Sequence, residues 1–333
     1  MGNMAGMAVP VTLACGAYDR TLPLALGEVR AQGVDLTYLP MAPEEVFWRM
    51  TRHGEFDAAE MSMSSYLVRL ARGDTALVAI PVFTSRMFRH SCIWINADAG
   101  IRRPEDLKAK RMGVPEYQVT AVVWIRGFLQ DDYGVAPSDM RWYRGGLIQP
   151  GRVEKLEIQP PGVELNAIDP TRTLSEMLAS GEIDALMAPR PPSTYDGDHV
   201  RRLFPDFRAA EADYYRRTKI FPIMHTVVIR RELLDRHPWL ARSLYDALCE
   251  AKRRTLRNLV DWPAALVTSL PWQLAETEAT QALMGTDFWP YGVEPNRKTL
   301  EALARYHHDQ GLSERQVSVD EMFAASTLDE YVI

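Results

Sequence analysis

Short apolar runs alternate with longer amphipathic segments near the start of the chain, and this alternation constrains the fold more than any other feature. The runs have the length and the Val, Ile and aromatic content of strands, whereas the segments between them repeat apolar residues with the spacing of a helix. The predicted strands are 9–14, 34–39, 56–61, 77–83 and 90–96, and the predicted helices are 21–31, 43–51 and 62–72. This order predicts an α/β fold with mostly parallel sheets that helices cover on both faces. A ligand would lie beyond the carboxyl ends of the strands, at 18–21, 60–65 and 84–89.

A second unit of the same kind begins near residue 104. Its predicted strands are 111–114, 140–143, 163–167 and 183–187, with a long helix through residue 133. A further apolar strand, 221–230, precedes a helix over 238–259 and a largely helical C-terminal tail. The chain can therefore be drawn as two lobes with two hinge crossings, near 90–96 and 221–230. The first lobe would be discontinuous (1–95 and 222–333), the second would be 97–220, and the ligand cleft would lie between them. This is the two-lobed shape of type II periplasmic-binding proteins, although periodicity alone leaves it as one topology among several.

Length, charge and cysteine content exclude several other classes of protein. A chain of 333 residues is long for a single core and favours two domains. The net charge of −6 argues against nucleic-acid binding, and no apolar stretch approaches the roughly 18 residues of a membrane span. Cys15, Cys92 and Cys249 are widely spaced, and no basic and apolar export signal precedes them. We therefore predict a cytoplasmic protein without a nucleic-acid or membrane partner, and leave open whether it forms a homo-oligomer.

Five motifs make the choice of topology sharper. In chain order they are FTSRMFRHSCIWIN (83–96), GVPEYQVTAVVWIRGFLQDDYGV (113–135), APRPPS (188–193), FPIMHTVVIR (221–230) and DFWPYG (287–292). Together they resemble the 4,5-dihydroxyphthalate decarboxylase family over nearly the whole chain. Trp94 and Val119 depart from the family pattern, in which we expect Tyr and Met, and neither changes an ionisable group that we assign to the chemistry. The resemblance implies a binding-protein-like cleft that has acquired a reaction: the non-oxidative decarboxylation of 4,5-dihydroxyphthalate to 3,4-dihydroxybenzoate.

Such a reaction needs a clamp for a small aromatic dicarboxylate. Two places where a strand passes into a helix offer free N–H groups and the helix dipole to an anion. The guanidinium groups predicted at strand ends can supply the charged partner that a buried dicarboxylate requires. The candidate substrate-binding residues are Ser62, Ser64, Ser65, Tyr117, Gln118, Thr120, Arg20, Arg86, Arg89 and Arg190. Capping of the helix by the serines and solvation of individual arginines are the ordinary alternatives.

The reaction also needs an acid that protonates the ring carbon. His225 is the first candidate, because it lies in an otherwise apolar strand at a predicted crossing and imidazole changes charge readily near neutral pH. A buried structural histidine is the competing interpretation. Glu60 and Glu116 are the rival acids, since each follows a predicted strand and burial could raise its pKa.

No cofactor is predicted. The chain has no HxH, HExxH or clustered Cys and His, no GxGxxG after a strand and no P-loop. We therefore expect a metal-free site, with a divalent ion as the alternative. Two other functions stay open: a solute-binding protein for a small organic anion, and another lyase on the same fold, such as a chorismate dehydratase.

Overall fold

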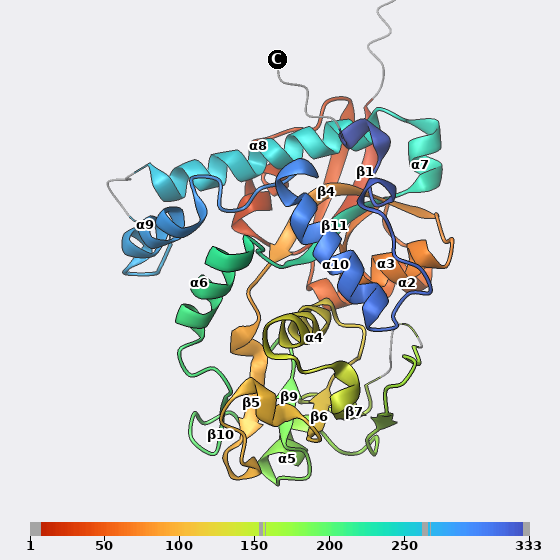
Figure 1. Ribbon diagram of the computed structural model, residues 1–333. Coiled ribbons are helices and arrows are strands. Elements are labelled where there is room, and N and C mark those ends of the chain that lie inside the picture. The colour runs from red at the N-terminus through yellow and green to blue at the C-terminus, as the bar shows by residue number, and fades with distance from the viewer. Residues whose placement is uncertain (1–7, 153–155, 157, 262–265, 267, 329–333) are drawn as a thin grey trace, which may run out of the picture.

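The computed structural model describes the whole chain except residues 1–7, 153–155, 157, 262–265, 267 and 329–333. The described residues form a pair of sheets, one above the other in Figure 1. The first sheet has the order β2-β1-β3-β11-β4 and the second β10-β5-β9-β6-β7-β8. Their strands are β1 (Val9–Cys15), β2 (Val34–Pro40), β3 (Ala58–Ser62), β4 (Leu77–Arg86), β5 (Ile93–Asn96), β6 (Arg111–Val114), β7 (Arg141–Arg144), β8 (Leu165–Ala167), β9 (Ala185–Met187), β10 (Val200–Arg202) and β11 (Ile223–Arg230).

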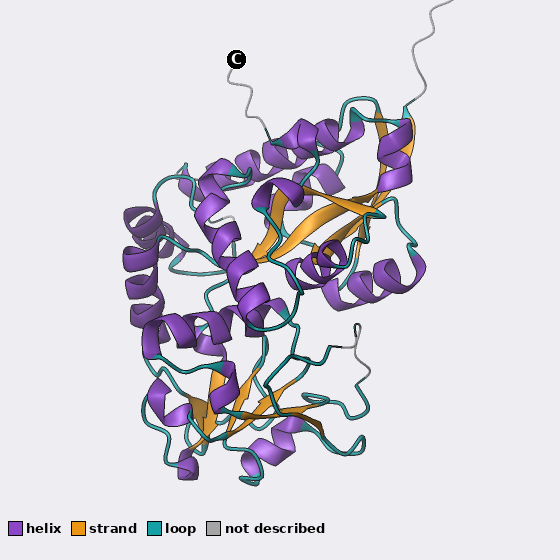
Figure 2. Cartoon of the chain, turned by 45° about the vertical axis from the view of Figure 1, so that its right-hand side comes forward, coloured by secondary structure: helices purple, strands orange, loops and turns teal. Residues whose placement is uncertain are grey.

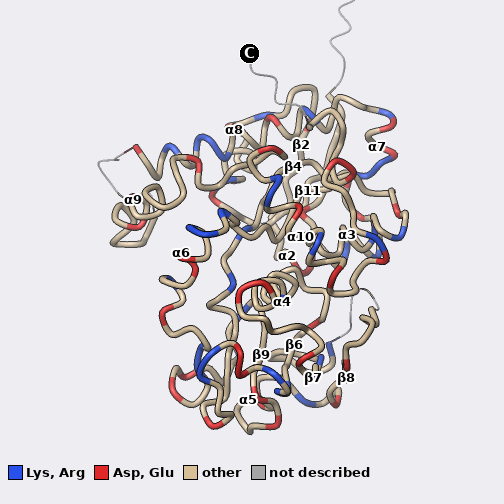
Figure 3. Tube along the Cα trace, viewed as in Figure 1, with Lys and Arg blue, Asp and Glu red and all other residues tan. Residues whose placement is uncertain are grey.

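Helices surround both sheets, as Figure 2 shows. They are α1 (Leu22–Ala25), α2 (Pro43–His53), α3 (Met63–Ala71), α4 (Thr120–Tyr133), α5 (Leu174–Ala179), α6 (Phe207–Thr218), α7 (Arg231–Arg236), α8 (Leu240–Val260), α9 (Gln273–Met284) and α10 (Arg297–Asp309). Local sequence sets their ends: α2 begins at Pro43, whose fixed φ suits a first helical turn, and stops at Gly54 with φ of 57°. Within the described residues, none of the helices combines the length and apolarity needed to cross a membrane. Basic and acidic residues are interspersed along both lobes in Figure 3.

Both sheets are mixed, so the predicted parallel pairing holds within each lobe but not for the strands next to the crossings. β1 runs parallel to β2 and β3, and β6 runs parallel to β7 and β9. β11, however, is antiparallel to β3 and β4, and β5 is antiparallel to β9 and β10. The reason is the chain path: β11 enters the first sheet on its return from the second lobe, so it runs against its neighbours.

The boundary predicted at residue 95 is wrong. β4 is the last strand of the first sheet before the chain leaves that lobe, and it ends at Arg86. The next strand, Ile93–Asn96, already pairs within the second sheet. The outgoing crossing therefore precedes Ile93. The returning strand β11 lies between β3 and β4.

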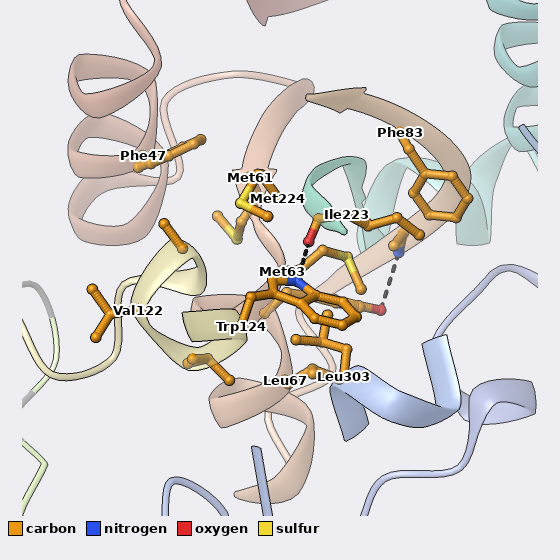
Figure 4. Close-up of a cluster of buried hydrophobic side chains, with 14 of the residues drawn as sticks. Phe47, Met61, Met63, Leu67, Phe83, Val122, Trp124, Ile223, Met224 and Leu303 are labelled. Carbon is orange, nitrogen blue, oxygen red and sulfur yellow. Dashed lines mark hydrogen bonds between the residues drawn. The ribbon is translucent and has the colours of Figure 1, made fainter. Parts of the chain in front are cut away.

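Helix α4 follows a strand of the second sheet but packs against the first lobe. Trp124 of α4 lies among Met63 and Leu67 of α3 and Leu303 of α10 in Figure 4, and its indole donates a hydrogen bond of 2.9 Å to the carbonyl of Ile223. The side chains from Thr120 to Leu129 are buried throughout. One continuous core therefore joins the two lobes.

Candidate active site

A cavity of about 800 Å³ lies between the lobes. Its walls include α2 and the ends of β3 and β4 from one lobe, and the start of α4 and residues 146–150 from the other. Of the predicted site residues, those that line it are Ser62, Ser65, Arg89, Glu116, Gln118, Thr120, Arg190 and His225. A second hollow of about 780 Å³, among α4, α6 and α10, contains none of the predicted residues. We therefore take the interlobe cavity as the candidate site.

The pairing of β11 with β4 is irregular around His225, which lines this cavity. The pairing of β11 with β4 shifts register on both sides of His225. In a regular strand, consecutive side chains face opposite sides of the sheet. Here, however, Met224 and His225 both line the cavity. Irregular pairing of this kind is a common way to redirect a side chain at a functional site.

The carboxylate of Glu60 lies directly behind His225. Its Oε1 is 2.7 Å from Nδ1 of His225 and accepts hydrogen bonds from the hydroxyls of Tyr18 (2.8 Å) and Thr84 (2.9 Å). Its Oε2 accepts a bond of 2.9 Å from the amide of Gly16. Burial by itself would raise the pKa of this carboxyl, but the hydrogen bond and the charge of His225, with the bonds from Gly16 and Tyr18, outweigh it and lower the pKa to about 2.

The expectation that burial raises the pKa of Glu60 is therefore wrong, and the role of Glu60 as the acid stays a prediction. Because an ionised carboxylate only accepts hydrogen bonds, Nδ1 of His225 carries the proton between the two groups. That leaves Nε2 as the nitrogen through which His225 can act in the cavity. The ring of Phe47 packs edge-on against the imidazole, with 4.8 Å between the ring centroids.

The arginines that line the cavity have different partners. Arg190 forms an ion pair of 2.9 Å with Glu44, and Arg152 forms one of 2.6 Å with Glu116. Arg89 is only 7% exposed, and its guanidinium contacts sulfur atoms: Sδ of Met224 at 3.3 Å and Sγ of Cys92 at 3.6 Å. Within the described residues, no carboxylate forms an ion pair with Arg89. A buried guanidinium without a carboxylate partner is suited to receive one from a ligand.

Glu116 lies in the cavity wall with partners of its own. Besides its ion pair with Arg152, it accepts a hydrogen bond of 3.2 Å from the amide of Gln118. Arg152 belongs to a Pro- and Gly-rich stretch that no sequence pattern placed at the site. Glu116 is thus an ion-paired acceptor here, and its role as the acid stays a prediction.

The two helix starts meet at the cavity floor. The hydroxyls of Ser62 and Thr120 are 2.9 Å apart, and the amide of Ser64 donates a bond of 3.1 Å to Thr120. Ser62 also caps α3 by accepting from the amide of Ser65 at 3.4 Å. Capping and a place in the cavity wall therefore coexist at Ser62.

Four predicted substrate contacts are absent from the described cavity lining. Arg86 is buried and donates to the carbonyls of Phe221 and Pro290 and to the side chain of Asn296, and burial lowers its pKa to about 9. The ring of Tyr117 lies under the guanidinium of Arg126 at 3.6 Å. Ser64 is fully buried, and Arg20 lies behind the wall that Tyr18 forms.

Tyr18, Thr84 and Phe47 are the site residues that sequence reasoning did not single out. Tyr18 and Thr84 fall within the strand-end ranges 18–21 and 84–89, where the sequence predicted the ligand to lie. Their position after a strand was therefore the sequence feature that could have identified them as site residues. Phe47 follows a helical pattern that is typical of core residues. Within the described residues, no group of three or more His, Cys, Asp or Glu side chains could hold a metal ion.

Comparison with known proteins decides the family. The chain is 44% identical over 326 residues to the 4,5-dihydroxyphthalate decarboxylase of Comamonas testosteroni, a match that covers 97% of this chain and 98% of that protein. The chain belongs to the 4,5-dihydroxyphthalate decarboxylase family. The 4,5-dihydroxyphthalate decarboxylase of Pseudomonas putida is 47% identical over 209 residues, covering 62% of this chain and 81% of that protein. No family model matches the chain.

Solved structures of other proteins share the fold of this member of the decarboxylase family. The periplasmic aliphatic sulphonate binding protein SsuA of Escherichia coli is 11% identical with a TM-score of 0.52, covering 96% of this chain and 99% of that one. DSZB in complex with biphenyl-2-sulfinic acid is 14% identical with a TM-score of 0.51, covering 96% and 98%. At these identities the likeness shows the fold alone. The predicted periplasmic-binding-protein-like fold is thus confirmed.

Proposed function

We propose that the chain is a carboxy-lyase that converts 4,5-dihydroxyphthalate into 3,4-dihydroxybenzoate and CO₂. The kinship with two decarboxylases of that name supports the reaction. The observation that carries it to this site is the buried, ionised Glu60 held against His225 at the cavity wall. A carboxylate in that position stabilises an imidazolium, which is the proton donor that the reaction needs.

Binding of the substrate would rest on Arg89. A ring with two adjacent carboxylates brings two negative charges into the cavity, and Arg89 is the lining arginine without a carboxylate partner in the described residues. The amides of Ser64 and Ser65 are already bonded to Thr120 and Ser62. The uncharged donors left for the second carboxylate are the second N–H of the Gln118 amide and the hydroxyl hydrogen that the Ser62–Thr120 pair leaves free. Arg89 contacts Met224, the residue before His225, and Arg89 and His225 line the same cavity, so we place the anchored ring between them.

The proton transfer determines the order of events. Direct loss of CO₂ would leave an aryl anion, so the carboxylate-bearing carbon is protonated first. Nε2 of His225 gives its proton to that carbon while the hydroxyl para to it donates electron density into the ring. The bond to the carboxylate then breaks, its electron pair restores aromaticity, and CO₂ leaves. One proton is consumed for each CO₂ released, and neutral His225 regains its proton from solvent.

Turnover of 4,5-dihydroxyphthalate tests the proposal directly. We expect equal amounts of CO₂ and 3,4-dihydroxybenzoate, and undiminished activity after treatment with a chelator. In His225→Asn, kcat should fall by about 10²–10⁴-fold while the substrate still binds. His308→Asn, a change at an exposed histidine, is the matched control.

Other outcomes would point elsewhere. Binding without CO₂ release would indicate a solute-binding protein, and conversion of chorismate with loss of water would indicate a dehydratase. Loss of turnover on chelation, restored by a divalent ion, would contradict the metal-free mechanism. If His225→Asn reduced stability but left kcat near the wild-type value, His225 would be a structural residue.

A further inference from the structure

The DFWPYG motif (Asp287–Gly292) has no role in the mechanism above, yet it is tied closely to the first lobe. The indole of Trp289 donates a hydrogen bond of 2.8 Å to the carbonyl of Phe83, and the amide of Gly292 donates one of 2.9 Å to the carbonyl of Pro81. Lys252 binds Asp287 at 2.8 Å and the carbonyl of Trp289 at 3.1 Å. The motif is therefore a strap across β4, just before Thr84.

This strap places Trp289 in a three-layered stack. The guanidinium of Arg20 lies 4.2 Å from the ring centroid of Tyr18 and also 4.2 Å from that of Trp289. From the edge of the guanidinium, Nε of Arg20 donates a bond of 2.8 Å to the carbonyl of Thr84, and Nη2 donates to the same oxygen. A planar guanidinium that stacks on two faces and donates from its edge fixes all three neighbours at once.

Two of those neighbours act on the same atom. The hydroxyls of Tyr18 and Thr84 both donate to Oε1 of Glu60, which is also the oxygen bound to Nδ1 of His225. Arg20 therefore acts on the His225–Glu60 pair indirectly, because it contacts both Tyr18 and Thr84, and these two residues bind Glu60. Its side chain is 14% exposed and is not among the described residues that line the cavity.

We propose that Arg20 and Trp289 are positioning residues: their stack holds Tyr18 and Thr84 on Glu60, and thereby keeps that carboxylate aimed at His225. The proposal rests on the proposed function, in which His225 is the proton donor. It replaces the predicted role of Arg20 as a substrate clamp.

The other groups that face Glu60 agree with this role. From β1, Sγ of Cys15 contacts Oε2 at 3.6 Å, and burial together with the charge of Glu60 raises the pKa of this thiol well above its usual value. Burial and the same charge also raise the pKa of Tyr18, so its hydroxyl stays a donor. From β2, the hydroxyl of Tyr38 donates to the carbonyl of Gly16 at 2.7 Å instead of to the carboxylate. Arg20 is therefore a cation placed behind this group of neutral donors.

Two variants, Arg20→Met and Trp289→Leu, distinguish a positioning role of Arg20 from direct binding of the substrate by Arg20. For a positioning role, we expect kcat to fall by about 10²-fold, the loss that a misplaced catalytic group causes. The dissociation constant for 4,5-dihydroxyphthalate, measured by calorimetry in the His225→Asn background, should stay close to its value in His225→Asn alone. The proton NMR resonance of the imidazole Nδ1–H bound to Glu60 should shift or broaden in both variants. Trp289→Phe, which keeps an aromatic face, should restore most of kcat.

The controls make every result decisive. Trp272→Ala, at an indole that is 74% exposed, should behave as wild type. A large rise in the dissociation constant of Arg20→Met with an unchanged Nδ1–H resonance would show that Arg20 is a clamp and overturn the proposal. Wild-type kcat and resonance in both variants would overturn it as well. Because the resonance is recorded without turnover, the proposal can be tested even if the wild-type protein does not decarboxylate 4,5-dihydroxyphthalate.

Discussion

At the scale of single residues, the site depends on how each charge is partnered. Glu60 is buried but surrounded by donors, whereas Arg89 is buried beside two sulfur atoms. The first arrangement stabilises a charge that belongs to the protein. The second leaves a charge without an ion pair among the described residues, on which the carboxylate of Glu211 acts from a longer distance, so it can receive a carboxylate from a ligand. The two side chains therefore divide the chemistry, Glu60 supporting the proton donor and Arg89 holding the substrate.

Arg89→Met should mainly weaken substrate binding. A charge-assisted hydrogen bond to a carboxylate contributes about 1.5–3 kcal/mol, so KM should rise by roughly 10–100-fold. Arg89→Lys, which keeps the charge, should recover some of that loss. Arg86→Met is a matched control, since Arg86 is equally buried but binds only groups of the protein. It should lower the melting temperature and leave KM near the wild-type value, and the reverse pattern would assign the clamp to Arg86.

Glu60→Gln should change how stability depends on pH. The pKa of Glu60 is lowered from 4.5 to about 2 in the folded protein, so its stabilising effect is complete above pH 4.5 and is lost as the pH falls toward 2. Between those values the wild-type protein should lose about 1.4 kcal/mol per pH unit more than Glu60→Gln. Urea unfolding at pH 5, 4 and 3 measures this difference. Parallel curves for the two proteins would show that the carboxylate is not held in its charged form.

The sequence could place these residues near the site but could not assign their partners. Glu60 and His225 were predicted from strand ends and an apolar strand, and the structure brings them within 2.7 Å. The direction of the Glu60 pKa was wrong because burial can be inferred from a sequence, whereas donors from distant segments cannot. Arg20 and Arg190 were chosen because they follow strands, yet stacking occupies one and Glu44 the other.

At the scale of elements, most strands formed where the apolar runs predicted them, and the differences have local causes. The helix predicted over 21–31 is reduced to Leu22–Ala25, since Gly27 adopts a φ of 73° and turns the chain. The irregular register between β11 and β4 has no signature in FPIMHTVVIR, because it comes from pairing with a strand far away in sequence. Patterns specify elements, whereas the irregular pairing beside His225 is a property of the assembled sheet.

Helix α4 gives a prediction at this scale through Gly127. A Cβ atom at Gly127 would lie 2.3 Å from the ring of Tyr306 in α10. Alanine favours a helix over glycine by about 1 kcal/mol, but overpacking a core costs about 1–3 kcal/mol. Gly127→Ala should therefore lower the free energy of unfolding of the otherwise wild-type protein, measured in urea. In the Tyr306→Leu background, the same change should raise the free energy of unfolding relative to Tyr306→Leu alone. A gain in the otherwise wild-type protein would mean that α4 and α10 are packed less tightly than the structure shows.

At the scale of the whole molecule, the lobes are joined more firmly on one side of the cavity than at its mouth. On the closed side, α4 makes buried bonds to the first lobe through Trp124, and Arg126 binds Gln310 at 2.8 Å. At the mouth, Arg190 and Glu44 pair with side chains that are 62% and 47% exposed. Exposed ion pairs contribute about 0–1 kcal/mol, so this contact can open without disturbing the core.

The pair at the mouth should therefore affect how fast the substrate arrives rather than how it reacts. Glu44→Gln removes a negative charge beside the cavity and frees Arg190, so kcat/KM for a dianion should rise, by up to about 5-fold for a pair of this strength. The gain should shrink as ionic strength increases, because the screening length is about 10 Å at 0.1 M salt. Glu45→Gln is the matched control: it removes the same charge from the same helix, but Glu45 pairs with Arg49 and lies outside the described cavity lining. Measurements of kcat/KM against salt for the three proteins decide the matter. A fall in kcat/KM for Glu44→Gln at every ionic strength would show instead that the bridge holds the cleft in its working shape.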